Sequence, residues 1–342
     1  MKKARVLAVL FLLLVGVGGA GYLYFQQQLR VPHAPPATGQ PVDIPPGLGV
    51  RGVLKLLHEK DIIADENLAL AYIALSGKRR ALKAGEYMFE KPMTIPEVID
   101  RLASGAIYLH HFTVPEGLTV AEIAQVWEAQ GFGKAEEFSS AASGAGSLVQ
   151  DLEGGEKPSV EGYLFPETYS FPSHTTAQKA VEAMVARFRV VLDQLKKKVP
   201  AEAWPLSARE TVILASLVEE EARMDDEREL VASVFMNRIK KKALLQCDPT
   251  VAYALQKVNR YRGTLLTVDL QFDSPYNTYK YPGLPPGPIS NPGRRSLEAA
   301  AKPASTDYYY FVRTTEGRHT FSETIAAHNR AVAAYRAMVR KK

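Results

Sequence analysis

Cysteine is almost absent from this 342-residue sequence, and neither sign of charge dominates it. The single cysteine, Cys247, excludes a disulfide within the chain and a cysteine-based zinc site. The 42 basic and 37 acidic residues leave a net charge of +5, which is spread along the chain without a nucleic-acid-binding motif. This mild positive balance suits an anionic polymer or a membrane surface but requires neither.

Patterns typical of metal sites are missing as well. His319 and His328 have no cysteine partners and no His-Glu-x-x-His helix, so we expect no metal and no other cofactor. What the sequence does have is a globular composition, with 46% hydrophobic and 23% charged residues. Its length is sufficient for two or three domains with cores of their own.

A long hydrophobic run near the N-terminus indicates where the protein resides. Residues 6–25 carry no charge, and a helix of this length can cross a hydrocarbon core of about 30 Å. Basic residues before the run and aromatic ones at its far end predict a cytoplasmic N-terminus and an outward-facing chain. A cleaved signal peptide is the alternative, although the run is long for one. We assign residues 1–29 to a cytoplasmic tip and a single-pass anchor in the inner membrane.

An internal repeat follows a proline-rich linker at residues 30–42. Residues 44–62 and 114–132 match at an offset of 70, and both copies read as a short strand, a Pro-Gly turn and an amphipathic helix. The unit resembles LysM modules, which bind the N-acetylhexosamine chains of peptidoglycan and chitin. We therefore expect carbohydrate binding by the first copy, whereas the second is expected to pack against the downstream domain.

Two stretches between the repeat and the C-terminal part are informative. Residues 139–146 are rich in Gly, Ser and Ala and predict a break. Residues 160–171, "VEGYLFPETYSF", contain Glu161 and Tyr163 among many aromatic side chains. They fit either the lining of a sugar groove or a cluster that seals a domain joint.

Three consecutive acids end an apolar run at residues 214–223, "LASLVEEEAR". Ser207 and Glu210 form a capping-box pattern, which predicts that a helix begins there. Since residues three and four apart share a helix face, Glu219 lies over small side chains that leave room for a substrate. Glu220 is expected to be the more solvated acid, whereas Glu221 lies over Leu217 and Val218 and is expected to be partly buried.

A carboxyl group in apolar surroundings has a raised pKa, because desolvation disfavours its charged form. Such a group can act as general acid on a glycosidic oxygen near neutral pH. An arbitrary acidic cluster is more often only the end of a helix, so the pattern alone leaves both interpretations open.

Downstream motifs carry a resemblance to a known family. The combination "LASLVEEEA…VASVFMNRI…LQCDPTVAYAL…YNTY…GLPPGPISNPG…HTFSETIAAHN" is similar to the membrane-anchored endolytic murein transglycosylases, the YceG-like family, over essentially the whole chain. The resemblance implies an α+β protein. It would have a transmembrane helix, a small LysM-like α/β subdomain at 43–108 and a mixed helical and β catalytic domain at 109–342. The second repeat, at 112–150, would lie within that catalytic domain.

The family's chemistry implies a mechanism and a set of site residues. Glu219 would protonate the oxygen between MurNAc and GlcNAc. It would then accept the proton of the MurNAc C6 hydroxyl, which closes a 1,6-anhydro ring. The positions that match the family's motifs, and are expected to bind substrate or orient the acid, are Gln246, Asp248, Tyr276, Asn277 and Tyr279. We add Glu221, Glu161 and Tyr163 to this supporting set from their surroundings in the sequence.

The resemblance also implies partners, and it leaves two rival functions open. The expected partners are peptidoglycan strands, the inner membrane and the peptidoglycan polymerases that supply nascent strands. One rival is a non-catalytic peptidoglycan-binding scaffold anchored in the membrane. The other is a hydrolytic muramidase that uses the same glutamate.

Overall fold

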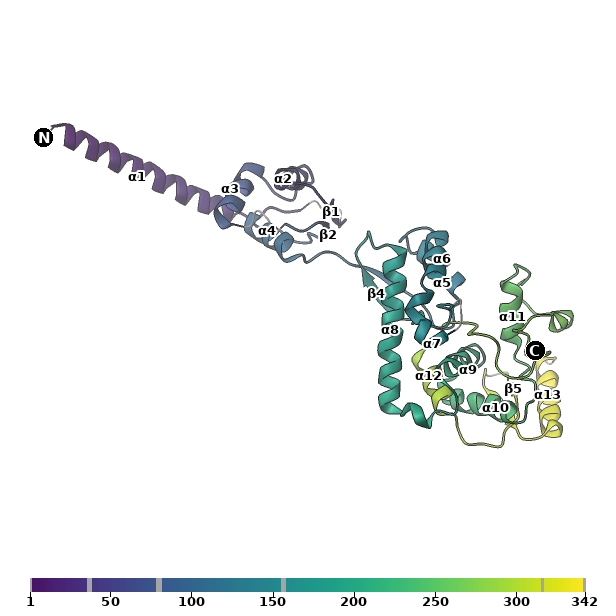
Figure 1. Cartoon of the computed structure of the whole chain (residues 1–342). Helices are drawn as coiled ribbons and strands as arrows, with labels where there is room; N and C mark the ends of the chain where they lie inside the picture. The colour runs from purple at the N-terminus through teal and green to yellow at the C-terminus, as the bar shows by residue number, and fades with distance from the viewer. Residues whose placement is uncertain (1, 36–38, 78–81, 155–157, 315–316, 341–342) are drawn as a thin grey trace. The chain divides into compact units, whose positions relative to one another are not determined.

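The computed structural model describes the chain except for residues 1, 36–38, 78–81, 155–157, 315–316 and 341–342. It divides into two compact units, of which the first comprises residues 1–111 with 170–174 and the second residues 112–169 with 175–342 (Figure 1). Within the described residues the structure is mostly helical, with three two-stranded sheets. The expected α+β class is therefore confirmed.

The first unit begins with the long helix α1 (Lys2–Leu29). An 18-residue window within its segment Arg5–Leu29 has a mean hydropathy of 2.4 and is not buried, so the length and composition of the helix suit a membrane span. The last turn differs, because Leu29 is buried in the core of the unit and Phe25 packs beside it. His33 then exchanges two backbone hydrogen bonds with Met93. Part of the predicted linker is thus attached to this unit.

The rest of the first unit is a small domain around one core. It contains β1 (Val42–Ile44), α2 (Val50–Glu59), α3 (Glu66–Ser76), β2 (Gly85–Tyr87) and α4 (Ile95–Ser104). β1 pairs antiparallel with β2, so that Val42 lies opposite Tyr87. Apolar residues three and four apart on α2 and α4 line the core, in which Leu57, Val98 and Leu102 are fully buried.

The second unit opens with the second copy of the repeat. It contains α5 (Val120–Ala129), α6 (Ala135–Gly144), η2 (Gly146–Val149) and α7 (Gln150–Glu153). β3 (His110–Thr113) pairs with β4 (Thr168–Phe171), and the boundary between the two units falls within both strands. The predicted repeat is confirmed, because α2 and α5 have equal lengths at the expected offset and follow equivalent turns. The turn glycines Gly47 and Gly117 have φ of 84° and 83°, a conformation that favours glycine.

The predicted break at residues 139–146 is wrong. Residues 139–144 belong to α6, Ala145 forms a turn, and Gly146 begins η2. Ala142 is buried, and α6 packs against both α5 and α8 (Ala177–Lys198). Small side chains here permit close helix packing, so tertiary contacts outweigh the weak helix propensity of Ser and Gly.

The remainder of the second unit surrounds helix α9 (Ala208–Glu221), whose residues 211–218 are all buried. The capping box of Ser207 and Glu210 begins this helix, as predicted. Helices α10 (Arg228–Lys240) and α12 (Arg294–Ala301) pack against it. The other elements are η3 (Ala201–Ala203), η4 (Asp225–Glu227), α11 (Asp248–Gln256) and η5 (Thr267–Gln271).

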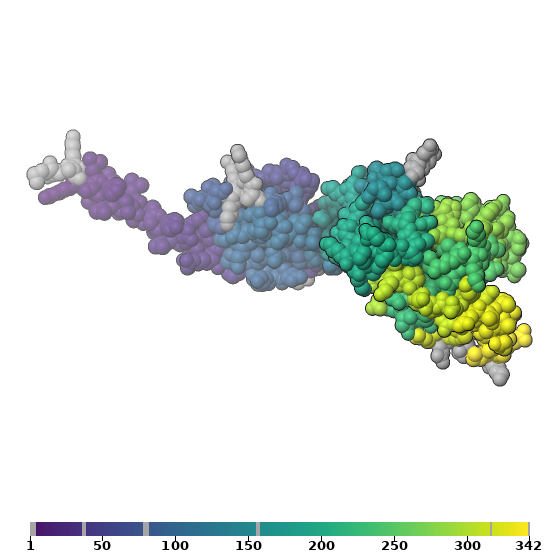
Figure 2. Space-filling view, turned by 60° about the horizontal axis from the view of Figure 1, so that its bottom comes forward, coloured from purple at the N-terminus to yellow at the C-terminus, as the bar shows by residue number. Residues whose placement is uncertain are grey.

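A hairpin and a helix complete the chain. β5 (Tyr310–Arg313) pairs antiparallel with β6 (His319–Ser322), and α13 (Ile325–Val339) packs on both strands. No residue of α13 is fully buried, and Figure 2 shows this yellow segment on the surface of the second unit.

Candidate active site

Helix α9 brings Glu219 out of the core of the second unit. The residues one turn before it, Ala215 and Ser216, are fully buried. The small side chains on this face are therefore covered and do not provide the room for a substrate that the sequence predicted. The Glu219 side chain itself is only 6% exposed. A carboxylate this close to the core requires polar partners, because burying an unpaired charge is costly.

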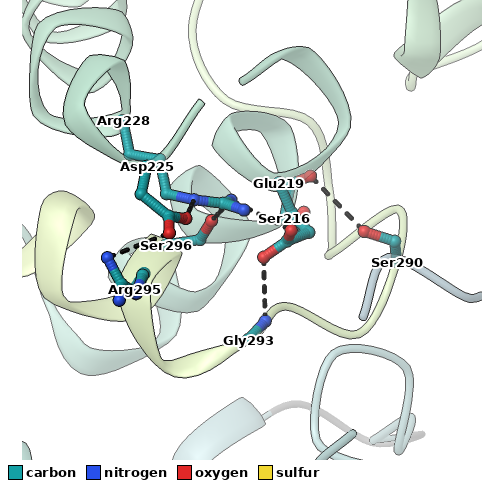
Figure 3. Close-up of polar contacts among 8 residues, drawn as sticks. All are labelled: Ser216, Glu219, Asp225, Arg228, Ser290, Gly293, Arg295 and Ser296. Atoms are coloured by element: carbon teal, nitrogen blue, oxygen red, sulfur yellow. Dashed lines mark hydrogen bonds and ion pairs between the residues drawn. The ribbon is translucent and has the colours of Figure 1, made fainter. Parts of the chain in front are cut away.

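Both carboxylate oxygens of Glu219 have a partner (Figure 3). Arg228 donates to Oε1 at 2.9 Å, and the backbone N–H of Gly293 donates to Oε2 at 2.9 Å. Figure 3 shows the carboxylate between these two donors, which come from α10 and from the loop before α12. The orientation of the Glu219 side chain is therefore fixed before any ligand binds.

Arg228 belongs to a charged network of its own. Its side chain is 8% exposed and also donates to the hydroxyl of Ser296 and to Asp225, the latter at 3.2 Å. Asp225 in turn pairs with Arg295 at 2.9 Å. Asp225 and Ser296 thus hold the guanidinium group in place independently of Glu219.

The loop at residues 289–293 is attached to α9 directly beneath Glu219. The Ser216 hydroxyl donates to the carbonyl of Ile213 at 2.7 Å and accepts the N–H of Ile289 at 3.1 Å. The hydroxyl of Ser290 donates to the Ser216 carbonyl at 3.4 Å. Ser216 therefore sets the position of the loop that presents the N–H of Gly293 to the carboxylate of Glu219.

A cleft of about 770 Å³ lies in front of Glu219. Its walls come from the second repeat at 116–122, from the end of α9, from α11 and from residues 261–265. The second repeat is thus part of the site itself, beyond the packing role expected for it. Among the residues that the structure describes, no group of three or more His, Cys, Asp and Glu side chains is arranged to hold a metal ion.

The two neighbouring glutamates differ from Glu219 and from each other. Glu220 is exposed to the cleft, where partial desolvation and three nearby carboxylates raise its pKa to about 7. Glu221 is partly buried, as predicted, and points toward the buried Cys247. Burial raises the pKa of Glu221 to about 7, while its hydrogen bond with the Cys247 thiol acts in the opposite direction.

Glu161 links three parts of the second unit. Its carboxylate accepts the N–H of Val120 at 3.0 Å, the Asn291 side-chain amide at 3.0 Å and the Tyr253 hydroxyl at 3.3 Å. Burial raises the pKa of Glu161 to about 7. These bonds join α5, the 289–293 loop and α11, and the carboxylate is not among the groups that line the cleft.

Three further predicted residues are engaged in internal contacts. The buried Tyr163 donates to Glu153 at 2.7 Å and packs edge-on against Phe188. The fully buried Asn277 donates to the carbonyls of Leu270 and Phe272 at 3.0 and 2.7 Å. Tyr276 packs against Tyr253, which lines the cleft, with 5.0 Å between the ring centroids.

The remaining three predicted residues lie around the start of α11. Asp248 lines the cleft and accepts the hydroxyl of Tyr279. Gln246 is exposed, and its side-chain oxygen accepts from Arg238 at 3.2 Å. Gln246 lies outside the set of cleft-lining residues, whereas Asp248 shares that cleft with Glu219.

Sequence reasoning missed Arg228, Asn291 and Gly293. Asn291 is fully buried and joins the loop to the second repeat, since its side-chain amide donates to the carbonyl of Leu118 at 2.9 Å. The signal for two of these residues was present in the motif "ISNPG", which has an unusual density of loop-forming residues. Nothing in the sequence singled out Arg228, because its partner is nine positions away on another helix.

Comparisons with known proteins identify the family of this chain. The profile of the YceG-like family matches residues 42–334. The chain is 34% identical over 333 residues to the endolytic murein transglycosylase of Bacillus subtilis (strain 168), covering 93% of this chain and 91% of that protein. It is 32% identical to the endolytic murein transglycosylase of Streptococcus pneumoniae serotype 2, with 97% of this chain and 65% of that longer protein covered.

A solved structure gives the same result for the fold. A crystal structure of a YceG-like protein from Listeria monocytogenes aligns with a TM-score of 0.58 and 30% sequence identity, covering 85% of this chain and 98% of that one. The family profile extends over most of both units, and the Bacillus protein matches nearly end to end. The chain therefore belongs to the YceG-like family.

Proposed function

We propose that this chain is a membrane-anchored lytic transglycosylase that cleaves MurNAc–GlcNAc bonds within peptidoglycan strands and leaves 1,6-anhydroMurNAc ends. In doing so it would terminate or release nascent strands. The observation that carries the proposal is one buried carboxyl, Glu219, fixed through both oxygens at the wall of a cleft. Names of the bacillary and streptococcal relatives support the same substrate class.

In this mechanism Glu219 transfers one proton in each direction. Protonated Glu219 donates to the glycosidic oxygen, and the C1–O bond of MurNAc breaks. The MurNAc C6 hydroxyl then attacks C1, and its proton returns to the Glu219 carboxylate. Because the substrate supplies its own nucleophile, the second carboxylate nucleophile or base of ordinary glycosidases is not needed.

The geometry around Glu219 suits both halves of this cycle. The guanidinium of Arg228 and the N–H of Gly293 stabilise the carboxylate that remains after the proton has left. They also hold it where it can accept the C6 proton, because positioned groups avoid the entropic cost of orientation. Asp248, Tyr253 and Glu220, on the cleft walls, would contact the sugars.

The first unit would anchor and assist this activity. The apolar helix Arg5–Leu29 would hold the chain in the inner membrane with the cleft outside the cytoplasm. The strand–helix–helix–strand arrangement of β1, α2, α3 and β2 supports the LysM-like assignment and a role in binding glycan. Enzymes that polymerise nascent strands are the partners that fit this setting.

Two variants and one product measurement test the proposal. Glu219→Gln keeps the side-chain shape but cannot donate a carboxyl proton, so we expect at least a 100-fold loss of glycan cleavage by the full-length protein in detergent. The exposed α6 residue Glu136 provides the control, and Glu136→Gln should cleave at the wild-type rate. Cleavage by Glu219→Gln at the wild-type rate would overturn the assignment.

Mass spectrometry of the products separates the proposal from its two rivals. Anhydro ends lack one water relative to the reducing ends that a muramidase makes. A scaffold without activity would leave uncrosslinked strands at their original length.

A further inference from the structure

Glu116, in the turn before α5, and Glu219 both lie close to Gly293. The N–H of Gly293 donates to Glu219, and a Cβ added at Gly293 would lie 1.9 Å from Oε1 of Glu116. The Glu116 carboxylate therefore occupies the space that a side chain at position 293 would need. Given standard backbone dimensions, the two carboxylates lie no more than about 7 Å apart. Both line the same cleft.

The internal repeat shows that folding does not require an acid at this position. Glu116 corresponds to Pro46 in the first copy, where the turn has the same form and Pro46 is exposed. The two glycines that follow, Gly47 and Gly117, have nearly the same φ. A carboxylate at position 116 is therefore a feature of the copy that borders the cleft, and the turn forms without one.

The surrounding charges leave Glu116 without a cation of its own. Groups that face it come from α9, η4, α10 and α12, namely Glu219, Asp225, Arg228 and Arg295. Arg295 pairs with Asp225, and Arg228 pairs with both Asp225 and Glu219. Among the described residues, no ion pair includes Glu116. Burial, and then the charge of Glu219, raise the pKa of Glu116.

We propose that Glu116 and Glu219 form a carboxyl pair that holds one proton, with Glu116 as the positioning residue that keeps this proton available on Glu219. Three carboxylates face two guanidinium groups here, so a single proton makes the cluster neutral. Two carboxylates that share a site cannot both ionise freely. The negative charge of Glu116 offsets the positive charge of Arg228 beside the general acid.

The inference rests on the proposed function and completes its proton balance. The pair begins with one proton, which passes from Glu219 to the glycosidic oxygen as the C1–O bond breaks and the leaving sugar keeps the bonding electrons. The C6 oxygen then bonds to C1, and its proton goes to Glu219. The pair again holds one proton, so no other acid or base takes part.

The pH dependence of cleavage tests the pair. Wild type, Glu116→Gln and Glu116→Asp, each as full-length protein in detergent, are compared on uncrosslinked glycan strands from about pH 5 to about pH 9. Without the negative charge of Glu116, the pair loses the repulsion that favours its shared proton. We expect the basic limb of kcat/KM to move down by about one pH unit in Glu116→Gln. The loss should be about tenfold at alkaline pH and should nearly vanish at about pH 5.

Two further variants, Gly293→Ala and Glu220→Gln, keep the test specific, together with Glu116→Asp. Gly293→Ala suits the observed φ of −74°, so the conflict with Glu116 is its main effect and the same downward shift is expected. Glu116→Asp retains the charge and should recover most of the wild-type profile. Glu220 and Glu122 also lie near the cleft, so Glu220→Gln is measured alongside to identify any shift common to all of these acids.

Three results would overturn the inference. One is an unchanged limb in Glu116→Gln, and another is a loss of equal size at every pH, which a purely structural role would give. The third is an equal shift in Glu220→Gln. If Glu219→Gln cleaves like wild type, the proposed function fails instead, so the two failures are distinguishable.

Discussion

Arg228 and Glu219 form a buried ion pair, with 2.9 Å between Nη1 and Oε1 and side-chain exposures of 8% and 6%. The pair joins the first turn of α10 to the last turn of α9. Since each charge is removed from water, each depends on the other for compensation. The contact thus couples the stability of the helix pair to the geometry of the proposed general acid.

Removing Arg228 should therefore affect both folding and activity. Arg228→Met leaves the Glu219 carboxylate buried without a cation, and we expect a loss of about 3–5 kcal/mol in the free energy of unfolding. Arg228→Lys retains the charge but not the fork that reaches Glu219, Asp225 and Ser296, so an intermediate loss is expected. Urea titration measures both values. Equal stability of Arg228→Met and wild type would contradict the pairing.

Ser216 should matter through the loop that it holds. In Ser216→Ala the buried N–H of Ile289 loses its acceptor, which should cost about 1–3 kcal/mol in unfolding free energy. We also expect a lower kcat, because the same loop presents the Gly293 N–H to Glu219. Ser207→Ala, at the far end of α9, is the matched control. It should cost about 1 kcal/mol of stability but leave kcat unchanged.

Local rules were sufficient to predict several elements from the sequence. The capping box placed the start of α9 at Ser207, and the helix faces predicted an exposed Glu220 and a partly buried Glu221. The repeat predicted two equivalent turns, which the matching φ values of Gly47 and Gly117 confirm. All of these depend on contacts between residues close in the chain, which a sequence pattern records directly.

Long-range contacts could not be predicted in the same way. Glu161 was singled out for its aromatic neighbours, yet its bonds reach Val120, Tyr253 and Asn291, up to 130 positions away. The apolar surroundings inferred for Glu219 omitted the charge of Arg228. Which distant groups meet at a carboxylate depends on how whole helices pack, and periodicity contains no record of that packing.

Raised carboxyl pKa values predict that the folded state loses stability as the pH rises. The pKa of Glu161 is about 7 when folded, against an ordinary value of 4.5. The folded state therefore binds more protons than the unfolded state between these values, so the unfolding free energy falls with pH. Stability from this group is present below about pH 4.5 and is lost through about pH 7.

Glu161→Gln tests this directly, because an amide oxygen can still accept from Val120 and no longer titrates. We expect the unfolding free energy of the variant to change less than that of wild type between about pH 5 and about pH 8, by about 3 kcal/mol, as measured by urea titration at each pH. Glu221 and Glu220 have pKa values raised to about 7 as well, so part of the pH dependence should remain in the variant. A variant with the full wild-type dependence would contradict the assignment.

Gly47 and Gly117 occupy equivalent turns of the two repeats, so a substitution at one is a control for the same substitution at the other. Gly47→Ala and Gly117→Ala both place a Cβ at a φ near +84°, so each should lose about 1 kcal/mol or more of unfolding free energy. Their surroundings differ, since nothing lies within 4 Å of a Cβ at Gly47, whereas one at Gly117 would lie 3.1 Å from Oε1 of Glu220 and 3.7 Å from Cγ of Glu219. We therefore expect glycan cleavage to fall severalfold in Gly117→Ala and to stay at the wild-type rate in Gly47→Ala. Equal rates in the two variants would mean that the second repeat does not shape the cleft around Glu219.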